Sequence, residues 1–159
     1  LILNMEMHFE NDDLILDGEN IQDKITMPEI SGVVSSYASI PEVRKMLVKL
    51  QRDMSNKYNV IMDGRDIGTV VLKDSKFKIF LTATPEERAE RRYSELIKRD
   101  IECSYDEILK DIIRRDHEDS TRAIDPLKKA DDAVEIDTTG LNIEQVTNKI
   151  NEFIRSKLN

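Results

Sequence analysis

The sequence predicts an α/β protein in which a parallel sheet is flanked by helices. Three short apolar runs, at residues 59–62, 77–83 and 133–136, alternate with longer segments that begin with helix-capping residues. Strands that alternate with helices in this way are typical of parallel sheets. The length of 159 residues fits one domain with a real core.

The first 20 residues predict a small antiparallel hairpin or meander. Residues 1–10 and 14–17 are β-like, and the turn-forming residues 11–13 join them. A second turn signal follows at residues 17–20.

Five predicted helices share one start signal, a small polar residue with Glu or Gln three positions later. The signals are Thr26…Glu29, Ser39…Glu42, Thr84…Glu87, Ser104…Glu107 and Asn142…Gln145. Pro41 and Pro85 strengthen two of them, because proline suits the first turn of a helix.

Composition narrows the classes of function. The net charge of -8 disfavours nonspecific nucleic-acid binding, so an anionic ligand would need a local cluster of arginines. No apolar run is long enough to predict a membrane span, and no signal peptide is evident. The single cysteine, Cys103, fits a reducing cytoplasm.

The segment after the first predicted core strand carries the most polar chemistry. Residues 60–62 lead directly into Asp63, Gly64, Arg65 and Asp66. In parallel sheets ligands bind beyond the carboxyl ends of the strands, so these side chains lie where a ligand is expected. Asp63 is suited to a hydrated Mg²⁺, Arg65 to a phosphate and Asp66 to an amino group on a base. The alternative is a salt bridge within the loop.

A second group lies on one predicted helix. Arg115, Asp119 and Arg122 are spaced i, i+4, i+7 and therefore share a helix face. They suit a clamp on phosphates, and the alternative is a solvated ladder of salt bridges.

A third group, Arg88, Arg91 and Arg92, follows the strand at residues 77–83. Three cations on one face repel each other unless an anion lies among them or carboxylates neutralise them. The neighbouring carboxylates are Glu87, Glu90 and Glu95. Ser35 and Arg44 are further candidates, although each residue alone is unremarkable.

The sequence contains no G-x-x-x-x-G-K-S/T motif, and its five glycines form no glycine-rich phosphate loop.

Four segments together resemble bacterial cytidylate kinases, the CMP/dCMP kinases of the P-loop nucleoside monophosphate kinase group. They are SSYASIPEVR (35–44), DGRDIGTVV (63–71), KIFLTATPEERAERR (78–92) and RRDHEDSTRAIDPL (114–127). The resemblance covers essentially the whole chain. It implies a P-loop NTPase-like fold that here lacks the first strand, the phosphate loop and the first helix. We expect that an N-terminal part of a longer protein is lost or not included.

The resemblance also implies a domain organisation. Residues 1–57 would form a small α+β CMP-binding insertion, and residues 58–159 the remainder of the kinase core, with a lid at about 88–122.

Roles for individual residues follow from the same resemblance. Asp66 would read the cytosine amino group, and Arg44, Arg65 and Arg122 would bind the CMP phosphate. The pentose would be sensed by Ser35, Arg115 and Asp119. Arg88, Arg91 and Arg92 would belong to the lid over ATP, and Asp63 would lie near the water shell of Mg²⁺. The catalytic set would be Arg65, Arg122, Arg91 and Arg92.

The implied activity is phosphoryl transfer from Mg²⁺-bound ATP to CMP or dCMP by a cytoplasmic, monomeric enzyme. Because the phosphate loop is absent from the sequence, we expect this chain itself to be inactive. The alternatives are a nucleotide-binding module without turnover and a structural fragment. Binding predicts that Arg44, Arg65, Arg115 and Arg122 converge, whereas a structural fragment predicts that they scatter. We also expect Arg122 to be solvated in the absence of ligand.

Overall fold

The computed structural model describes residues 6–11 and 13–158. The chain divides into two compact units, Leu1–Ile40 and Pro41–Asn159. This division falls earlier than the boundary predicted after Lys57, because the helix at Pro41–Lys57 packs against residues of the second unit. Whether residues 1–57 form one nucleotide-binding region stays a prediction.

The first unit contains a three-stranded antiparallel sheet and two helices. Strands β1 (Met7–Glu10), β2 (Asp13–Leu16) and β3 (Glu19–Asn20) are adjacent in chain order. Asp17 and Gly18 make the turn between β2 and β3 with positive φ angles of 49° and 82°. The predicted meander is therefore confirmed for the described residues, while residues 1–5 of the first predicted strand lie outside them. Helices α1 (Gln22–Ile25) and α2 (Pro28–Ala38) complete the unit.

The second unit contains four long helices: α3 (Pro41–Lys57), α4 (Pro85–Lys98), α5 (Tyr105–Thr121) and α6 (Ile143–Leu158). Each begins within two residues of a predicted start signal. At α4 the Thr84 hydroxyl accepts a hydrogen bond from the Glu87 amide at 3.2 Å. At α6 the side chains of Asn142 and Gln145 each accept from the other's amide at 2.9 Å, which is a complete capping box. Ser104 makes no such bond at α5.

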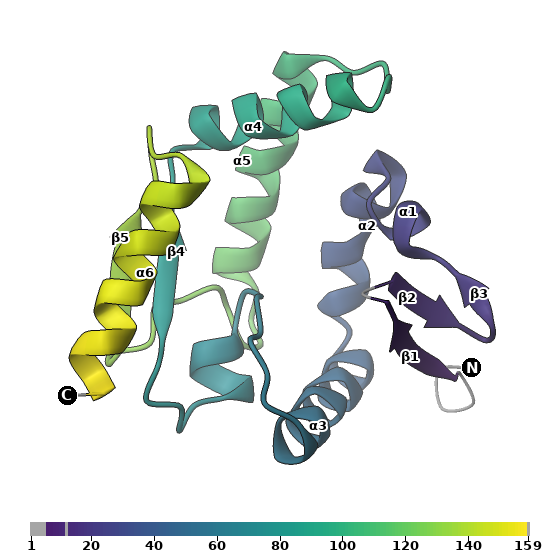
Figure 1. The fold of residues 1–159 in the computed structure, drawn as a ribbon. Helices are drawn as coiled ribbons and strands as arrows, with labels where there is room; N and C mark the ends of the chain where they lie inside the picture. The colour runs from purple at the N-terminus through teal and green to yellow at the C-terminus, as the bar shows by residue number, and fades with distance from the viewer. Residues whose placement is uncertain (1–5, 12, 159) are drawn as a thin grey trace. The chain divides into compact units, whose positions relative to one another are not determined.

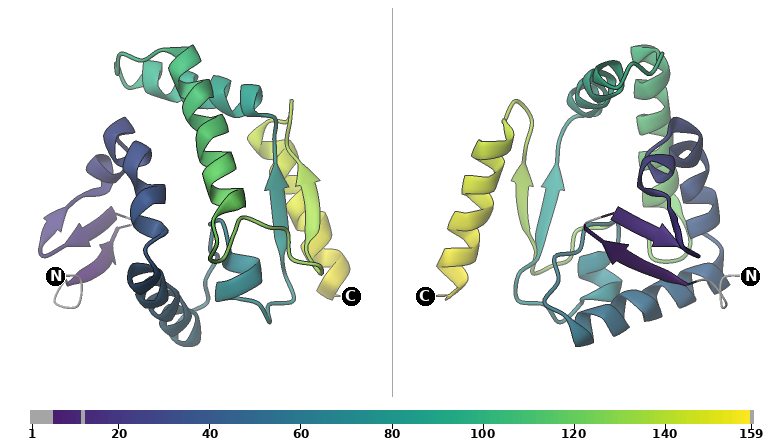
Figure 2. Two further views of the ribbon diagram at one scale, coloured as in Figure 1. Left: turned by 180° about the vertical axis from the view of Figure 1, so that it is seen from behind. Right: turned by 45° about the vertical axis from the view of Figure 1, so that its right-hand side comes forward.

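Two of the three predicted core strands form a parallel pair. Strand β4 (Ile79–Thr82) pairs with β5 (Val134–Asp137), with Ile79 opposite Val134 and Thr82 opposite Asp137. Helix α6 lies along this sheet, and α4 packs on α5 away from it (Figures 1 and 2). The predicted α/β class is thus confirmed at the level of helices around a small parallel sheet.

The prediction of a strand at residues 59–62, the first of the three along the chain, is wrong. No other strand among the described residues pairs with this segment, so no ladder hydrogen bonds hold it extended, and the Ile61 side chain is fully exposed. Residues 59–62 have no regular secondary structure, and a short π-helix, η2 (Ile67–Val71), follows them, in which the Leu72 amide donates to the Ile67 carbonyl at 2.7 Å.

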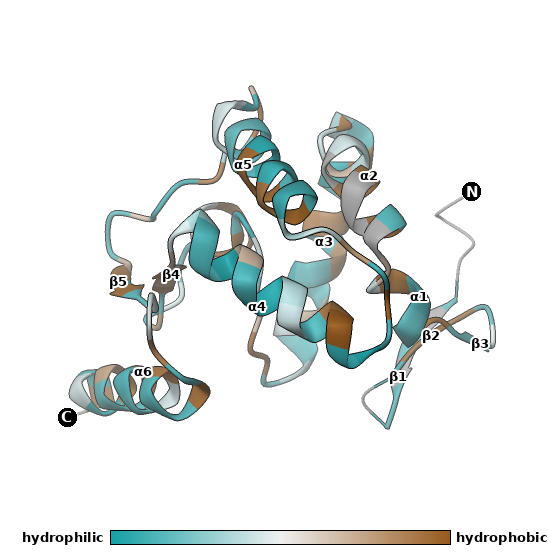
Figure 3. Ribbon diagram, turned by 90° about the horizontal axis from the view of Figure 1, so that it is seen from above, coloured by the Kyte–Doolittle hydropathy of each residue, from teal (hydrophilic) through white to brown (hydrophobic). Residues whose placement is uncertain are grey.

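The apolar core of the second unit is small and divided. Ala89 and Leu96 are buried where α4 meets α5, and Ile136 is buried in the sheet. Figure 3 shows β4 as a hydrophobic segment among largely hydrophilic helices, whereas β5 alternates between apolar and acidic residues. Ion pairs also join elements of this unit, and the site described below is built from them.

Among the described residues no helix combines the length and the apolar character that crossing a membrane requires.

Candidate nucleotide site

A continuous network of charged side chains joins four segments of the second unit. Its members are Arg44 in the first turn of α3, Arg65 and Asp66 before η2, Asp119 and Arg122 at the end of α5, and Asp125 just beyond it. Local structure places each of these side chains. The helix start at Pro41 positions Arg44, and the C-terminal end of α5 positions Asp119 and Arg122.

Arg44 is the buried centre of one half of the network, because only 7% of the residue is exposed. Its Nε donates to Asp125 Oδ2 at 2.7 Å, and its Nη2 forms a short ion pair with Asp66. Burial by itself lowers the pKa of Arg44, but the bond to Asp125 and the charge of Asp66 outweigh burial and raise it. The guanidinium is therefore held charged between two carboxylates.

Asp119 is the centre of the other half, with a side chain that is 5% exposed. Arg65 Nε lies 3.1 Å from its Oδ2, and Arg122 Nη1 lies 3.5 Å from its Oδ1. The Arg65 contact is close enough for an ion pair but is not aligned as a hydrogen bond, since Oδ2 has no hydrogen-bond partner. Asp119 thus balances the charge of two arginines, while its Oδ2 remains able to accept a hydrogen bond.

Asp125 connects the two halves. In addition to binding Arg44 through its carboxylate, it accepts a hydrogen bond from Arg122 Nε on its main-chain oxygen at 2.7 Å. The order of contacts is therefore Asp66, Arg44, Asp125, Arg122, Asp119 and Arg65. Arg44, Arg65 and Arg122, which come from three distant parts of the sequence, are thus linked in one network, and their convergence on a single anion stays a prediction.

The expectation that Arg122 is solvated is wrong. Only 10% of its side chain is exposed, because it lies between Asp119 and the backbone of Asp125. Burial is the main reason that the pKa of Arg122 is lowered, and the nearby charge of Arg44 lowers it further. Its buried Nη2 makes no hydrogen bond. An unpaired buried donor beside a second arginine is an arrangement that an anion would stabilise.

Arg115 lies one helical turn before Asp119 on α5, as predicted, but no ion pair joins it to the network. Its Nε is buried without a hydrogen-bond partner. Ser35 lies in α2 of the first unit, and its side chain is outside the described structure. The predicted pentose set is therefore not brought together by any described contact.

The three arginines of α4 bind carboxylates and carbonyls away from the network. Arg88 forms a two-pronged pair with Asp116 of α5, and Arg92 pairs with Glu95 at 3.0 Å. The pair of Arg92 with Glu95 matches the alternative in which neighbouring carboxylates neutralise the arginines, whereas Asp116 was not among the carboxylates named there.

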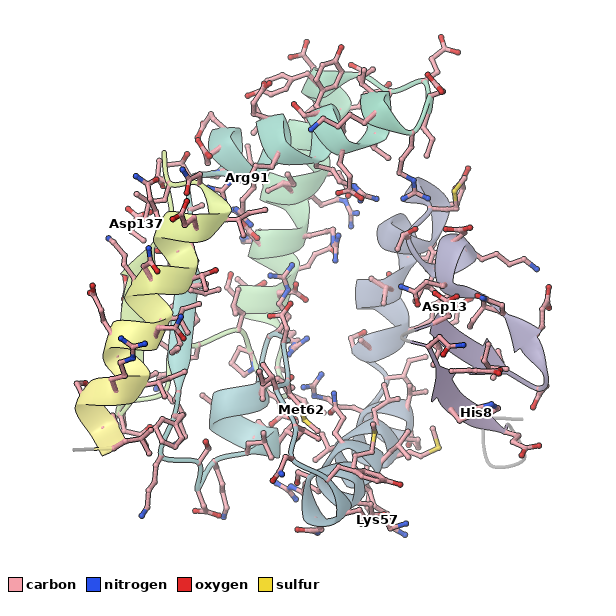
Figure 4. All side chains as sticks on the ribbon, viewed as in Figure 1. His8, Asp13, Lys57, Met62, Arg91 and Asp137 are labelled. Carbon is pink, nitrogen blue, oxygen red and sulfur yellow. The ribbon has the colours of Figure 1, made fainter. Side chains whose placement is uncertain are left out.

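Arg91 pairs with Glu87 and also donates to the main-chain oxygen of Thr138 at 2.6 Å. It therefore lies beside the carboxyl end of β5, where Asp137 is also labelled (Figure 4). The contact fastens the start of α4 to the end of the sheet.

Asp63 is exposed and makes no hydrogen bond or ion pair that involves another described residue. Among the described residues no group of three or more His, Cys, Asp or Glu side chains is arranged to hold a metal ion. A lone exposed carboxylate fits a hydrated Mg²⁺ that arrives with a nucleotide, because Mg²⁺ keeps several of its waters and uses few protein ligands.

Sequence reasoning missed Asp125 and Asp116, which supply carboxylates to Arg44 and Arg88. Asp125 offered a weak signal, because aspartate tolerates the left-handed conformation and it precedes Pro126 at the end of a helix. Its φ is 48°. Nothing in the sequence indicated that it reaches Arg44, 81 positions earlier.

Comparison with known proteins places this chain in a family. A family model described as cytidylate kinase matches residues 1–156. The chain belongs to the cytidylate kinase family. A cytidylate kinase from Clostridium perfringens is 64% identical over 154 residues, which cover 97% of this chain and 71% of that protein. A cytidylate kinase from Clostridium acetobutylicum is 56% identical over 158 residues, covering 99% of this chain and 73% of that protein. One from Clostridium tetani is 51% identical over 158 residues, covering 99% and 70%.

Membership in the cytidylate kinase family confirms the resemblance read from the sequence. The protein is a nucleotide-binding kinase of the P-loop NTPase-like α/β class. Residues 35–44, 63–71 and 114–127, which carry the resemblance, are also the segments that contribute Arg44, Arg65, Asp66, Asp119, Arg122 and Asp125.

Proposed function

We propose that this kinase transfers the γ-phosphoryl group of ATP to CMP or dCMP. The observation that carries the proposal is the linkage of Arg44, Arg65 and Arg122 through Asp119 and Asp125. An acidic chain with a net charge of -8 has gathered three guanidinium groups at one place. Family membership makes a nucleotide phosphate the expected ligand of such a cluster.

In this proposal Arg44, Arg65 and Arg122 bind the phosphate of the acceptor nucleotide. Guanidinium groups suit this task because their planar donors match phosphate oxygens in pairs. The buried Nη2 of Arg122 has no protein partner and supplies one such donor. A cavity of about 880 Å³ meets the network at Arg44 and Asp125 and runs along α3. Arg65, Asp66 and Arg122 do not line it, so it adjoins the network at one end only.

Asp66 selects the base. Its carboxylate only accepts hydrogen bonds, so it can pair with the amino group of cytosine but not with the carbonyl that uracil has at the same position. The side chain is 13% exposed, which makes an unpaired or repelled charge costly. Discrimination against UMP would then be on the order of 10²-fold.

Ser35, Arg115 and Asp119 bind the pentose in this proposal. The buried, unpaired Nε of Arg115 and Oδ2 of Asp119 offer one donor and one acceptor to hydroxyl groups. Residues 1–57 would serve as the CMP-binding insertion, with Ser35 as its contribution to the pentose site.

Arg88, Arg91 and Arg92 contact the donor nucleotide as part of a lid at about residues 88–122. Each now has a protein partner, so closure would exchange Asp116, Glu87 and Glu95 for phosphate oxygens. During transfer Arg65, Arg122, Arg91 and Arg92 would neutralise charge on the moving phosphoryl group, which is the main catalytic task in this chemistry. Asp63 would hold the water shell of Mg²⁺, which supplies charge neutralisation on the donor phosphates. We propose a monomer.

A chain restricted to these 159 residues would bind the acceptor without turnover, because its sequence has no glycine-rich loop to hold the donor phosphates. One experiment distinguishes binding without turnover from binding with turnover. ADP release with CMP, dCMP, UMP or AMP as acceptor is measured beside calorimetric titration with CMP, for this chain and for a version that carries a phosphate loop.

We expect CMP binding by both chains and turnover only by the version with the loop, with CMP and dCMP far better acceptors than UMP. Equal rates with UMP would contradict the role of Asp66. If neither chain binds CMP, the proposed function is overturned.

A further inference from the structure

Asp125 joins the two halves of the network by binding both Arg44 and Arg122. Asp125 holds the Arg44 guanidinium with its carboxylate and the Arg122 guanidinium with its main-chain oxygen, each at 2.7 Å. It does so from a left-handed backbone conformation, with φ of 48°. The side chain and the backbone of Asp125 therefore act separately on two arginines.

Charges in the network balance without any ligand. Three guanidinium groups, of Arg44, Arg65 and Arg122, face three carboxylates, of Asp66, Asp119 and Asp125. A phosphate monoester that enters this network brings negative charge, so the balance holds only if a carboxylate withdraws. The structure therefore raises the question of which carboxylate gives up its arginine.

Solvent access distinguishes the three carboxylates. The side chains of Asp119 and Asp66 are 5% and 13% exposed, whereas that of Asp125 is 30% exposed. A buried carboxylate that loses its cation stays unpaired at high cost, while a carboxylate at the edge of the network can turn into water. Asp125 can also release Arg44 without releasing Arg122, because Arg122 is held by the backbone.

We propose that Asp125 is an internal counter-ion that occupies Arg44 in the empty site and is displaced from it by the phosphate group of the acceptor nucleotide. The inference rests on the proposed function for the identity of the nucleotide. In the exchange the Arg44 Nε–H stops donating to Asp125 and donates to a phosphate oxygen. The carboxylate of Asp125 therefore lowers phosphate affinity, and its charge keeps Arg44 fixed while no ligand is bound.

The test is the affinity of Asp125→Asn for CMP, measured by calorimetric titration. Asparagine tolerates the same left-handed conformation and can still accept a hydrogen bond, but it carries no charge. We expect Asp125→Asn to bind CMP about fivefold more tightly than the original protein, the order of effect of one partly exposed charge. Cytidine, which has the base and sugar but no phosphate, should bind both proteins equally.

Two controls locate the effect. Asp100 also has a positive φ, of 56°, and is exposed, so Asp100→Asn makes the same chemical change at a site outside the network and should leave CMP affinity unchanged. In an Arg44→Gln background the substitution Asp125→Asn should no longer tighten binding, because the cation that the carboxylate blocks is gone.

Unchanged or weaker CMP binding by Asp125→Asn overturns the inference, and weaker binding would identify Asp125 as a residue that only positions Arg44. Inorganic phosphate serves as a second probe that does not depend on the base. If the original protein fails to bind CMP, the proposed function is overturned. Tighter binding of inorganic phosphate by Asp125→Asn would still support the role of Asp125 as a counter-ion of Arg44. If neither the original protein nor Asp125→Asn binds inorganic phosphate, the counter-ion role of Asp125 is overturned.

Discussion

Arg65 Nε lies 3.1 Å from Asp119 Oδ2, although the two residues come from a loop and from the end of a long helix. On its other side Asp119 faces Arg122, so one buried carboxylate compensates two cations. The loss of this carboxylate should therefore affect both arginines.

The first prediction concerns Asp119. Asp119→Asn should lower the free energy of unfolding by about 3 kcal/mol, because it leaves Arg122 buried without the charge that compensates it. Urea unfolding of the original protein and the variant measures the difference. Asp111→Asn is the matched control on the same helix. Asp111 pairs with Arg114 but is 39% exposed, so its loss should cost far less stability than the loss of Asp119. Equal losses for the two variants would contradict the buried role of Asp119.

The second prediction concerns base selection by Asp66. Asp66→Ala should reduce the preference for CMP over UMP on the order of 10²-fold and should lower kcat/KM for CMP. The physical reason is loss of the acceptor for the amino group, together with release of Arg44, which Asp66 now holds. Steady-state kinetics with both nucleotides check this in the protein that carries a phosphate loop. Asp74→Ala, at an exposed loop position, should keep the preference. Asp66 would be removed from the site by unchanged kinetics for CMP.

The third prediction concerns acid stability. Two hydrogen bonds from the buried Lys78, at 2.7 and 2.9 Å, hold the pKa of Asp132 below its ordinary value of 3.8. A carboxyl group whose pKa is lowered by folding contributes stability above its unfolded pKa, and that contribution is lost as the pH falls through the folded pKa.

Asp132→Asn should therefore be less stable than the original protein at neutral pH, and the difference should shrink as the pH falls below about 4. Thermal unfolding across this range measures it, with the exposed neighbour Asp131 changed to Asn as control. A difference that stays constant with pH would show that the pair contributes through packing alone.

The fourth prediction compares two helix starts that look alike in the sequence. Asn142→Ala should lower stability by about 1 kcal/mol, because its side chain accepts the Gln145 amide in a complete capping box. Ser104→Ala should cost much less, since Ser104 makes no capping hydrogen bond. Chemical unfolding of the two variants decides between them. A larger loss for Ser104→Ala would mean that its hydroxyl caps α5 in solution.

Local patterns predicted the helices well because a helix start is a local event. The signals at Thr84 and Asn142 correspond to capping bonds between residues three positions apart, and nothing distant is needed to form them. The segment at residues 59–62 failed for the opposite reason. A strand exists only when a neighbour pairs with it, and within the described residues none does.

The sequence by itself determined the class of fold, the positions of the long helices and the residues that resemble those of cytidylate kinases. Tertiary structure decided which of those residues meet. It brought Arg44, Arg65 and Arg122 into one network, kept Arg88, Arg91 and Arg92 on other partners, and buried Arg122. It also introduced Asp125, which reaches a residue 81 positions away. Ion pairs depend on distance in space and on solvent exposure, and neither quantity is encoded by spacing along the chain.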